Sequence, residues 1–152
     1  MKQAKKGSAK ARKKAARLVG VQIYHQTYLD DKPIEDLVRE ALIHHINQEV
    51  DGEDLITADA ELLSKIVQGA YNTKDYLIEL IQPNLKERQF GNLDNILQSI
   101  LLLGSYELLN HSDIDAPIIV NDYLDVGHAF YEPKEVTLLN AVLDKVSKSV
   151  RS

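Results

Sequence analysis

The strongest constraint on the fold is the spacing of apolar residues, which recur three and four positions apart along most of the chain. This spacing places them on one side of an α-helix, whereas a half-buried strand needs strict alternation. Residues 93–109 show it most clearly, at Leu93, Ile96, Leu97, Ile100, Leu101, Gly104 and Leu108. The sequence therefore predicts an all-α fold with residues 93–109 as the central buried helix.

Prolines and polar breaks divide the rest of the chain, giving about six to seven helices in all. We expect the others to cover residues 9–28, Pro33 to about Gln48, Thr57 to Pro83, and the segments after Pro117 and Pro133. Thr57 is the expected N-cap of the third helix, which Pro83 ends because proline lacks an amide hydrogen. Gly104 lies inside the central helix, where glycine costs about 1 kcal/mol relative to alanine. It therefore predicts the close approach of a neighbouring helix.

The charge distribution is strongly asymmetric. Residues 1–17 hold eight of the 18 basic residues and no acid, so the remaining 135 residues carry 10 basic and 23 acidic residues, a net charge of −13. We predict a flexible basic arm over residues 1–11 and a single helical domain over 12–152, with a subdivision near 83–91. Like charges repel one another, and a polyanion would relieve that repulsion, so nucleic acid is the favoured partner. A disordered solubilising tail is the alternative.

The start of the chain favours single-stranded RNA over a duplex. Its basic side chains suit phosphates, and its aromatic side chains suit exposed bases. An acidic remainder would repel the other phosphates of a duplex, so contact should stay local to the arm. The candidate RNA-binding residues are Lys10, Arg12, Lys13, Lys14, Arg17 and Tyr24.

Several function classes are disfavoured. The chain has no Cys, which removes thiol nucleophiles and Cys-based metal sites and favours a reduced, cytoplasmic setting. No nucleophile, zinc or phosphate-loop motif is found. His44 and His45, near Glu40 and Glu49, are best interpreted as a polar helix face, because adjacent helical residues point about 100° apart. We expect no enzyme, catalytic residue, metal site or cofactor.

The carboxylate pairs and the apolar runs likewise give no indication of catalysis, a membrane span or secretion. Asp122 and Asp125 are expected on a solvated helix face, without an acid–base role. The longest apolar run, residues 100–104, is far shorter than the roughly 20 residues that span a bilayer. The basic start is not followed by an apolar stretch long enough for a signal peptide. We therefore expect no membrane association and no secretion.

Three segments, in order, resemble the NusB family of transcription antitermination factors. Residues 12–17 (RKKAAR), followed by VQIY, resemble its basic, alanine-containing first helix. Residues 100–108 (ILLLGSYEL), followed by the turn at Asp113 to Pro117 and by VND at 120–122, resemble its ILRLGxYEL, turn and [IV]NE pattern. Residues 139–145 (LNAVLDK) resemble its closing VNGVLDK. The likeness runs from about residue 12 to 148 and is weakest over 30–60.

The resemblance implies an all-helical fold of two small packed subdomains and no catalytic activity. It implies binding of boxA-type single-stranded RNA together with NusE, a small ribosomal-subunit protein, in an RNA polymerase antitermination complex that serves ribosomal RNA operons. It carries an RNA-contact role to the basic segment 12–17 and adds Asn140, for which a cap or an interhelical hydrogen bond is an equal alternative.

Some positions depart from the family pattern. Leu102 replaces the Arg of ILRLG, Leu97 and Gln98 replace charged residues, and Leu138 replaces an aromatic residue. These changes bear on the expected contacts with the protein partner and with RNA bases. Two other functions stay open. One is a stand-alone NusB-like module that recognises ribosomal RNA, and the other is a homo-oligomeric helical interaction protein such as a homodimer.

Overall fold

The computed structural model describes residues 7–47 and 57–151, and no strand occurs within these ranges. The helices are α1 (Ala9–Gln26), α2 (Ile34–Asn47), α3 (Ala60–Asn72), α4 (Lys74–Ile81), α5 (Asn95–Asn110), α6 (Ala116–Phe130) and α7 (Pro133–Val150), with 3₁₀ turns η1 (Gln82–Asn84) and η2 (Phe90–Asn92). The all-α prediction is confirmed. Since α1 begins at Ala9, the last residues of the predicted arm 1–11 are helical, whereas residues 1–6 lie outside the described residues.

The single third helix expected from Thr57 to Pro83 is wrong, because the structure divides it into α3 and α4. The break falls at Thr73, whose φ of −117° and ψ of 22° are not helical. Its hydroxyl donates a 2.7 Å hydrogen bond to the carbonyl of Gly69, one turn back. Such local bonds compete with helix continuation. The N-cap of α3 is Asp59 rather than Thr57, and its side chain accepts from the amide of Leu62 at 3.0 Å.

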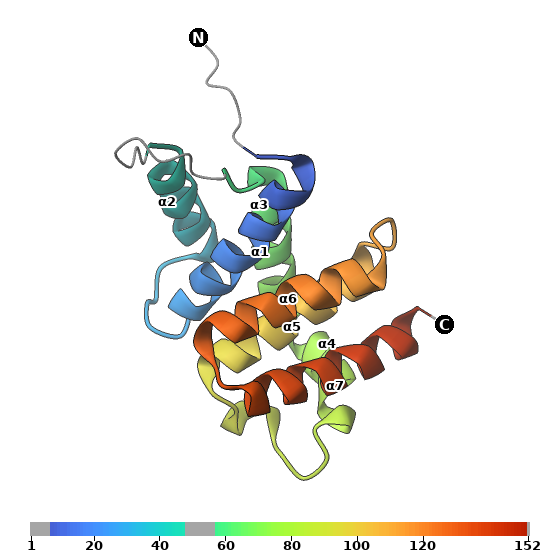
Figure 1. Ribbon diagram of the computed structural model, residues 1–152. Helices are drawn as coiled ribbons and strands as arrows, with labels where there is room; N and C mark the ends of the chain where they lie inside the picture. The colour runs from blue at the N-terminus through green and yellow to red at the C-terminus, as the bar shows by residue number, and fades with distance from the viewer. Residues whose placement is uncertain (1–6, 48–56, 152) are drawn as a thin grey trace.

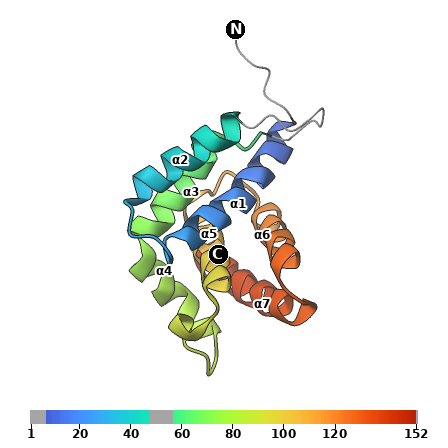
Figure 2. The same cartoon turned by 90° about the vertical axis from the view of Figure 1, so that its left-hand side faces the viewer.

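The helices form two groups, α1 to α3 and α4 to α7, which meet along α1 and α5 (Figures 1 and 2). Helix α5 packs against α1, α3, α4, α6 and α7. Every residue from Leu97 to Ser105 is buried, so α5 is enclosed on all sides, as expected of the central helix. One cluster of buried residues draws members from both groups. The connection near 83–91 lies within the second group, and the chain passes between groups at Thr73.

Two glycines mark close helix contacts. A Cβ added at Gly104 would lie 3.0 Å from Cδ2 of Leu143 on α7, which confirms the neighbouring helix that this residue predicts. A Cβ added at Gly69 would lie only 2.2 Å from Cζ of Tyr106, so the ring of this α5 residue rests against the backbone of α3. A side chain at Gly69 would overlap the end of the Tyr106 ring, whereas one at Gly104 would require Leu143 to give by a few tenths of an ångström.

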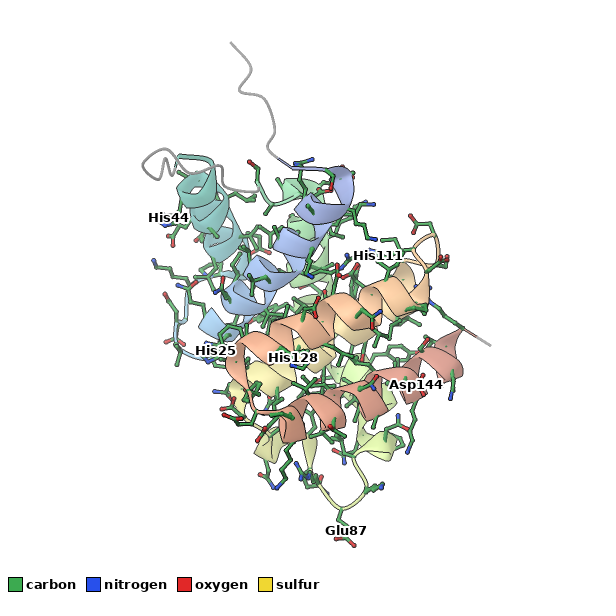
Figure 3. All side chains as sticks on the ribbon, in the orientation of Figure 1. His25, His44, Glu87, His111, His128 and Asp144 are labelled. Atoms are coloured by element: carbon green, nitrogen blue, oxygen red, sulfur yellow. The ribbon has the colours of Figure 1, made fainter. Side chains whose placement is uncertain are left out.

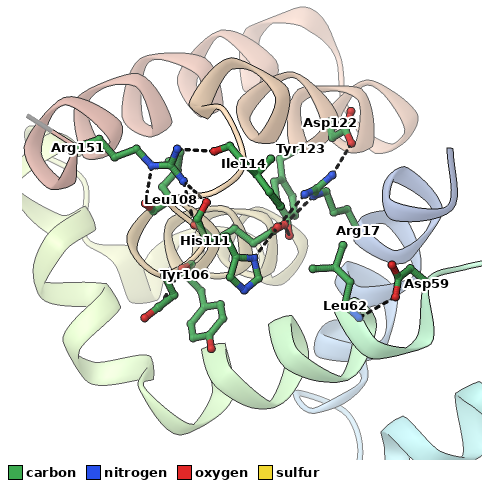
Figure 4. Close-up of polar contacts among 12 residues, drawn as sticks. Arg17, Asp59, Leu62, Tyr106, Leu108, His111, Ile114, Asp122, Tyr123 and Arg151 are labelled. Carbon is green, nitrogen blue, oxygen red and sulfur yellow. Dashed lines mark hydrogen bonds and ion pairs between the residues drawn. The ribbon is translucent and has the colours of Figure 1, made fainter. Parts of the chain in front are cut away.

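The C-terminal end of α7 is tied to the end of α5. The guanidinium of Arg151 donates to the carbonyls of Leu108 at 2.8 Å and His111 at 2.7 Å, and to that of Ile114 in the following turn (Figure 4). The last carbonyls of a helix have no partner within it and carry partial negative charge. Arg151, the C-cap residue of α7, therefore also caps the C-terminal end of α5 with its side chain.

Replacing Leu102 with alanine should lower the free energy of unfolding by about 2–5 kcal/mol, because its side chain is completely buried in α5 and truncation leaves a cavity. Leu18→Ala is the matched control, since Leu18 is 37% exposed, and should cost clearly less. Urea unfolding followed by circular dichroism measures both. Equal losses for the two variants would contradict the central position of α5.

Candidate nucleic-acid interface

Arg17, an expected RNA contact, is a core residue instead. Its side chain is 1% exposed. Its Nε and Nη2 donate to the two carboxylate oxygens of Glu107 on α5 at 2.7 and 2.8 Å. Its Nη1 donates to Asp122 on α6 at 2.9 Å (Figure 4). A guanidinium occupied by two carboxylates is not available to an RNA phosphate, so Arg17 is removed from the candidate interface.

Glu107 on α5 accepts hydrogen bonds from two other helices, α1 and α6, and contacts the turn that follows α5. Besides the Arg17 fork, it accepts a 2.7 Å hydrogen bond from the hydroxyl of Tyr123, and Nδ1 of His111 lies 3.1 Å from its Oε1. Burial alone would raise the pKa of Glu107, but the hydrogen bonds from Arg17 and His111 and the charge of Arg17 lower it to about 2. Burial and the adjacent Glu107 raise the pKa of Tyr123. The carboxylate therefore stays ionised inside the core.

Tyr24 also departs from its expected role. It is 1% exposed, and its ring contacts the rings of Tyr28 and Tyr71 edge-on, with centroids 6.2 Å apart in both pairs. It cannot stack on an RNA base from this position. The reason is that α1 is covered by α2, α3, α5 and α6, so its buried residues extend around most of the helix.

The sequence alone assigns no functional role to Asp122 or Glu107, although it contains a signal for their contact with Arg17. Arg17 precedes Gly20, Val21 and Tyr24 by three, four and seven positions, which is the spacing of one helix face. All three of these residues are buried. An arginine on such a face needs a buried acidic partner, and the Glu of the YEL segment was the available one.

Four cations remain at the start of α1, and we call Lys10, Arg12, Lys13 and Lys14 the α1 basic cluster. Lys10 is exposed and Lys13 half-buried, and neither makes an ion pair with the residues that the structure describes. Nε of Arg12 donates to the carbonyl of Thr57 at 3.2 Å. Lys14 pairs with Asp125 of α6, and this hydrogen bond raises the pKa of the lysine.

The helix start itself supports anion binding by the α1 basic cluster. Ser8 is the N-cap, and its side chain accepts from the amide of Ala11 at 3.1 Å. The first turn carries no acidic residue. The positive end of the helix dipole and the four side-chain charges therefore act in the same direction, toward a phosphate.

Asn140, the last expected RNA contact, is exposed on α7. Helix α6 lies between α1 and α7 in both views, and α7 packs against α5 and α6 (Figures 1 and 2). Asn140 and the α1 basic cluster therefore belong to helices that are not packed against each other. Leu97 and Leu102 are buried, so these departures from the family pattern belong to the core rather than to a partner surface. Leu138 is partly buried against the same core.

Neither a metal centre nor a membrane span is found in the part of the chain that the structure describes. No group of three or more His, Asp or Glu residues there could hold a metal ion. The side chains of His45 and Glu49 lie outside that part. The five histidines are His25, His44, His45, His111 and His128, and Figure 3 labels all except His45. No helix within the described ranges is long and apolar enough to cross a bilayer.

The sequence model of the NusB family matches residues 14–148. This chain belongs to the NusB family. Transcription antitermination protein NusB of Allorhizobium ampelinum is 35% identical over 138 residues, covering 90% of this chain and 86% of that protein. The protein of the same name from Rhodopseudomonas palustris is 36% identical over 148 residues, covering 96% and 88%.

Solved structures share the NusB fold. NusB of T. maritima superposes with a TM-score of 0.74 at 18% identity, over 95% of this chain and 94% of that one. A chain from the crystal structure of NusB and NusE in complex with dsRNA gives a TM-score of 0.75 at 19% identity, over 91% and 98%. The family model and the sequence relatives confirm the resemblance carried by the three sequence segments, and the solved structures confirm the fold.

The buried ion pair of this NusB-family chain can be tested by removing one partner. Arg17→Met leaves the Glu107 carboxylate buried without its main donor, so the free energy of unfolding should fall by about 3–5 kcal/mol. Lys148→Met removes the exposed pair with Asp144 and should cost at most about 1 kcal/mol. Chemical denaturation measures both values. A small loss in Arg17→Met would contradict the central role of the pair.

Stability should also fall in acid because of Glu107. The unfolded chain takes up a proton near the ordinary pKa of 4.5, whereas the folded protein does so only near 2, so unfolding becomes easier as the pH drops between these values. Urea unfolding from pH 6 to 2.5 measures the effect. Glu107→Gln lacks this group and should show a shallower pH dependence than the wild type. Identical slopes would show that Glu107 does not carry the acid sensitivity.

Proposed function

We propose that this chain is an RNA-binding transcription antitermination factor that acts together with NusE. The observation that carries the proposal is the α1 basic cluster, four cations at a helix start that has no acid in its first turn. Membership of the NusB family and relatives named as transcription antitermination proteins support it. The fold is shared with a NusB chain solved with NusE and dsRNA.

The proposed ligand is a boxA-type single-stranded RNA. Its phosphates bind to the α1 basic cluster, and the lysines of residues 1–6 add further charge. The rest of the chain, with its net charge of −13 beyond residue 17, repels phosphates and confines the RNA to the start of α1. Asn140 contacts RNA only if the strand continues across α6, so we assign it a secondary role.

The acidic remainder of the chain suits the proposed protein partner. NusE is a ribosomal protein, and a basic surface would be attracted to this acidic body while RNA occupies the basic cluster. The complex would join RNA polymerase in the cytoplasm, on ribosomal RNA operons, without any catalytic step by this chain. Residues 12–152 would then act as one RNA-binding domain.

The test is a titration of the full chain with a boxA-like RNA at several salt concentrations, with a scrambled strand and a duplex as comparisons. Four phosphate contacts give a slope of log affinity against log salt near −3, from about −0.7 per contact in single strands. Lys10→Gln with Lys13→Gln should bring the slope to about −1.5. The matched control is Lys145→Gln with Lys148→Gln on α7, which should leave it unchanged.

Equal affinity for the boxA-like and scrambled strands would overturn the proposed ligand. A capture experiment with purified NusE tests the partner, with and without the RNA. A stable homodimer that ignores both RNA and NusE would instead support the interaction protein left open by the sequence.

A further inference from the structure

Helix α6 presents carboxylates to the basic face of α1. Asp122 binds Arg17 in the interior, and Asp125, about one turn further along α6, reaches Lys14 at the surface, with Nζ and Oδ2 2.5 Å apart. The two side chains of the outer pair are 54% and 51% exposed. One member of the α1 basic cluster is therefore already neutralised by an acid of the same chain.

The ion pairs of Arg17 and Lys14 differ in whether an external anion can replace the carboxylate. The fork of Arg17 is enclosed, with Glu107 completely buried, so no external anion can replace its acceptors. The Lys14 pair is exposed, and exposed pairs are weak because water and salt compete for both charges. A phosphate oxygen and a carboxylate oxygen are equivalent acceptors for an ammonium group, so each can displace the other.

We propose that Asp125 is an intramolecular competitor of RNA phosphate, which holds Lys14 in the free protein and has to release it before Lys14 binds the RNA. The inference rests on the proposed function, since it concerns the same basic cluster. It assigns Asp125 a role in setting RNA affinity, opposite in sign to that of Lys10, Arg12 and Lys13. An RNA strand that places no phosphate at Lys14 leaves the pair with Asp125 intact, and Lys14 then adds nothing to the affinity for that RNA.

The experiment compares RNA affinity among variants of the full chain, with the boxA-like strand at fixed ionic strength. Asp125→Asn keeps the shape of the side chain, removes the competing charge, and should tighten binding by about 2- to 5-fold, the range set by the strength of an exposed pair. Asp144→Asn is the matched control. It also removes an exposed carboxylate paired with a lysine, but on α7 (Figure 3), and should leave the affinity unchanged.

A double-mutant cycle separates competition for Lys14 from general repulsion of RNA by Asp125. Lys14→Gln alone should weaken binding, and adding Asp125→Asn to it should restore little. A gain from Asp125→Asn that persists at full size without Lys14 would overturn the proposal, as would wild-type affinity in Asp125→Asn alone. If the wild type itself binds no RNA, the proposed function fails and this inference with it. Binding that responds to Lys10 and Lys13 but not to Asp125 overturns the inference alone.

Discussion

The buried contact between Arg17 and Glu107 is the interaction on which the arrangement of helices depends. Two charges inside a core stabilise it only when their geometry is good and their remaining hydrogen-bonding capacity is met. Here the fork is bidentate, and Asp122, Tyr123 and His111 supply the other partners. Because these groups come from α1, α5, α6 and the turn after α5, the contact fixes how far α1 slides and rotates against the rest. The contact between Arg17 and Glu107 therefore also fixes the position of the α1 basic cluster relative to the other helices.

Much of the helix order follows from local sequence. Prolines mark the starts of α6 and α7, and the apolar spacing of residues 93–109 identifies the enclosed helix. The break at Thr73 could not be predicted in the same way. The apolar spacing continues through it, and the signal that ends α3 is a single hydroxyl bonding back to Gly69. Asn72 and Thr73 are only mildly unfavourable in a helix, so their effect depends on the packing around them.

For the candidate interface, the sequence predicts the presence of the cations but not their exposure to solvent. The sequence identifies a basic helix start, but charge alone does not tell which cations face solvent. Arg17 and Lys14 lie three positions apart on the same helix, and one is buried while the other is half exposed. The difference arises because α5 and α6 cover one side of α1, and this covering depends on contacts between residues 90 and 105 positions apart in the sequence. Both aspartates of α6 are expected on a solvated face, which holds for the half-exposed Asp125 but not for Asp122, and each balances one cation of α1.

The contact between Tyr106 and Gly69 makes these two positions interdependent. The ring lies where a side chain at position 69 would begin, so the size of one residue limits the size of the other. An alanine at position 69 would require the end of the Tyr106 ring to shift, whereas glycine leaves the ring where it lies. In this chain, then, the tyrosine of the YEL segment and Gly69 form a steric pair spanning both helix groups, in which a larger residue at 69 requires the ring to move or a smaller residue at 106.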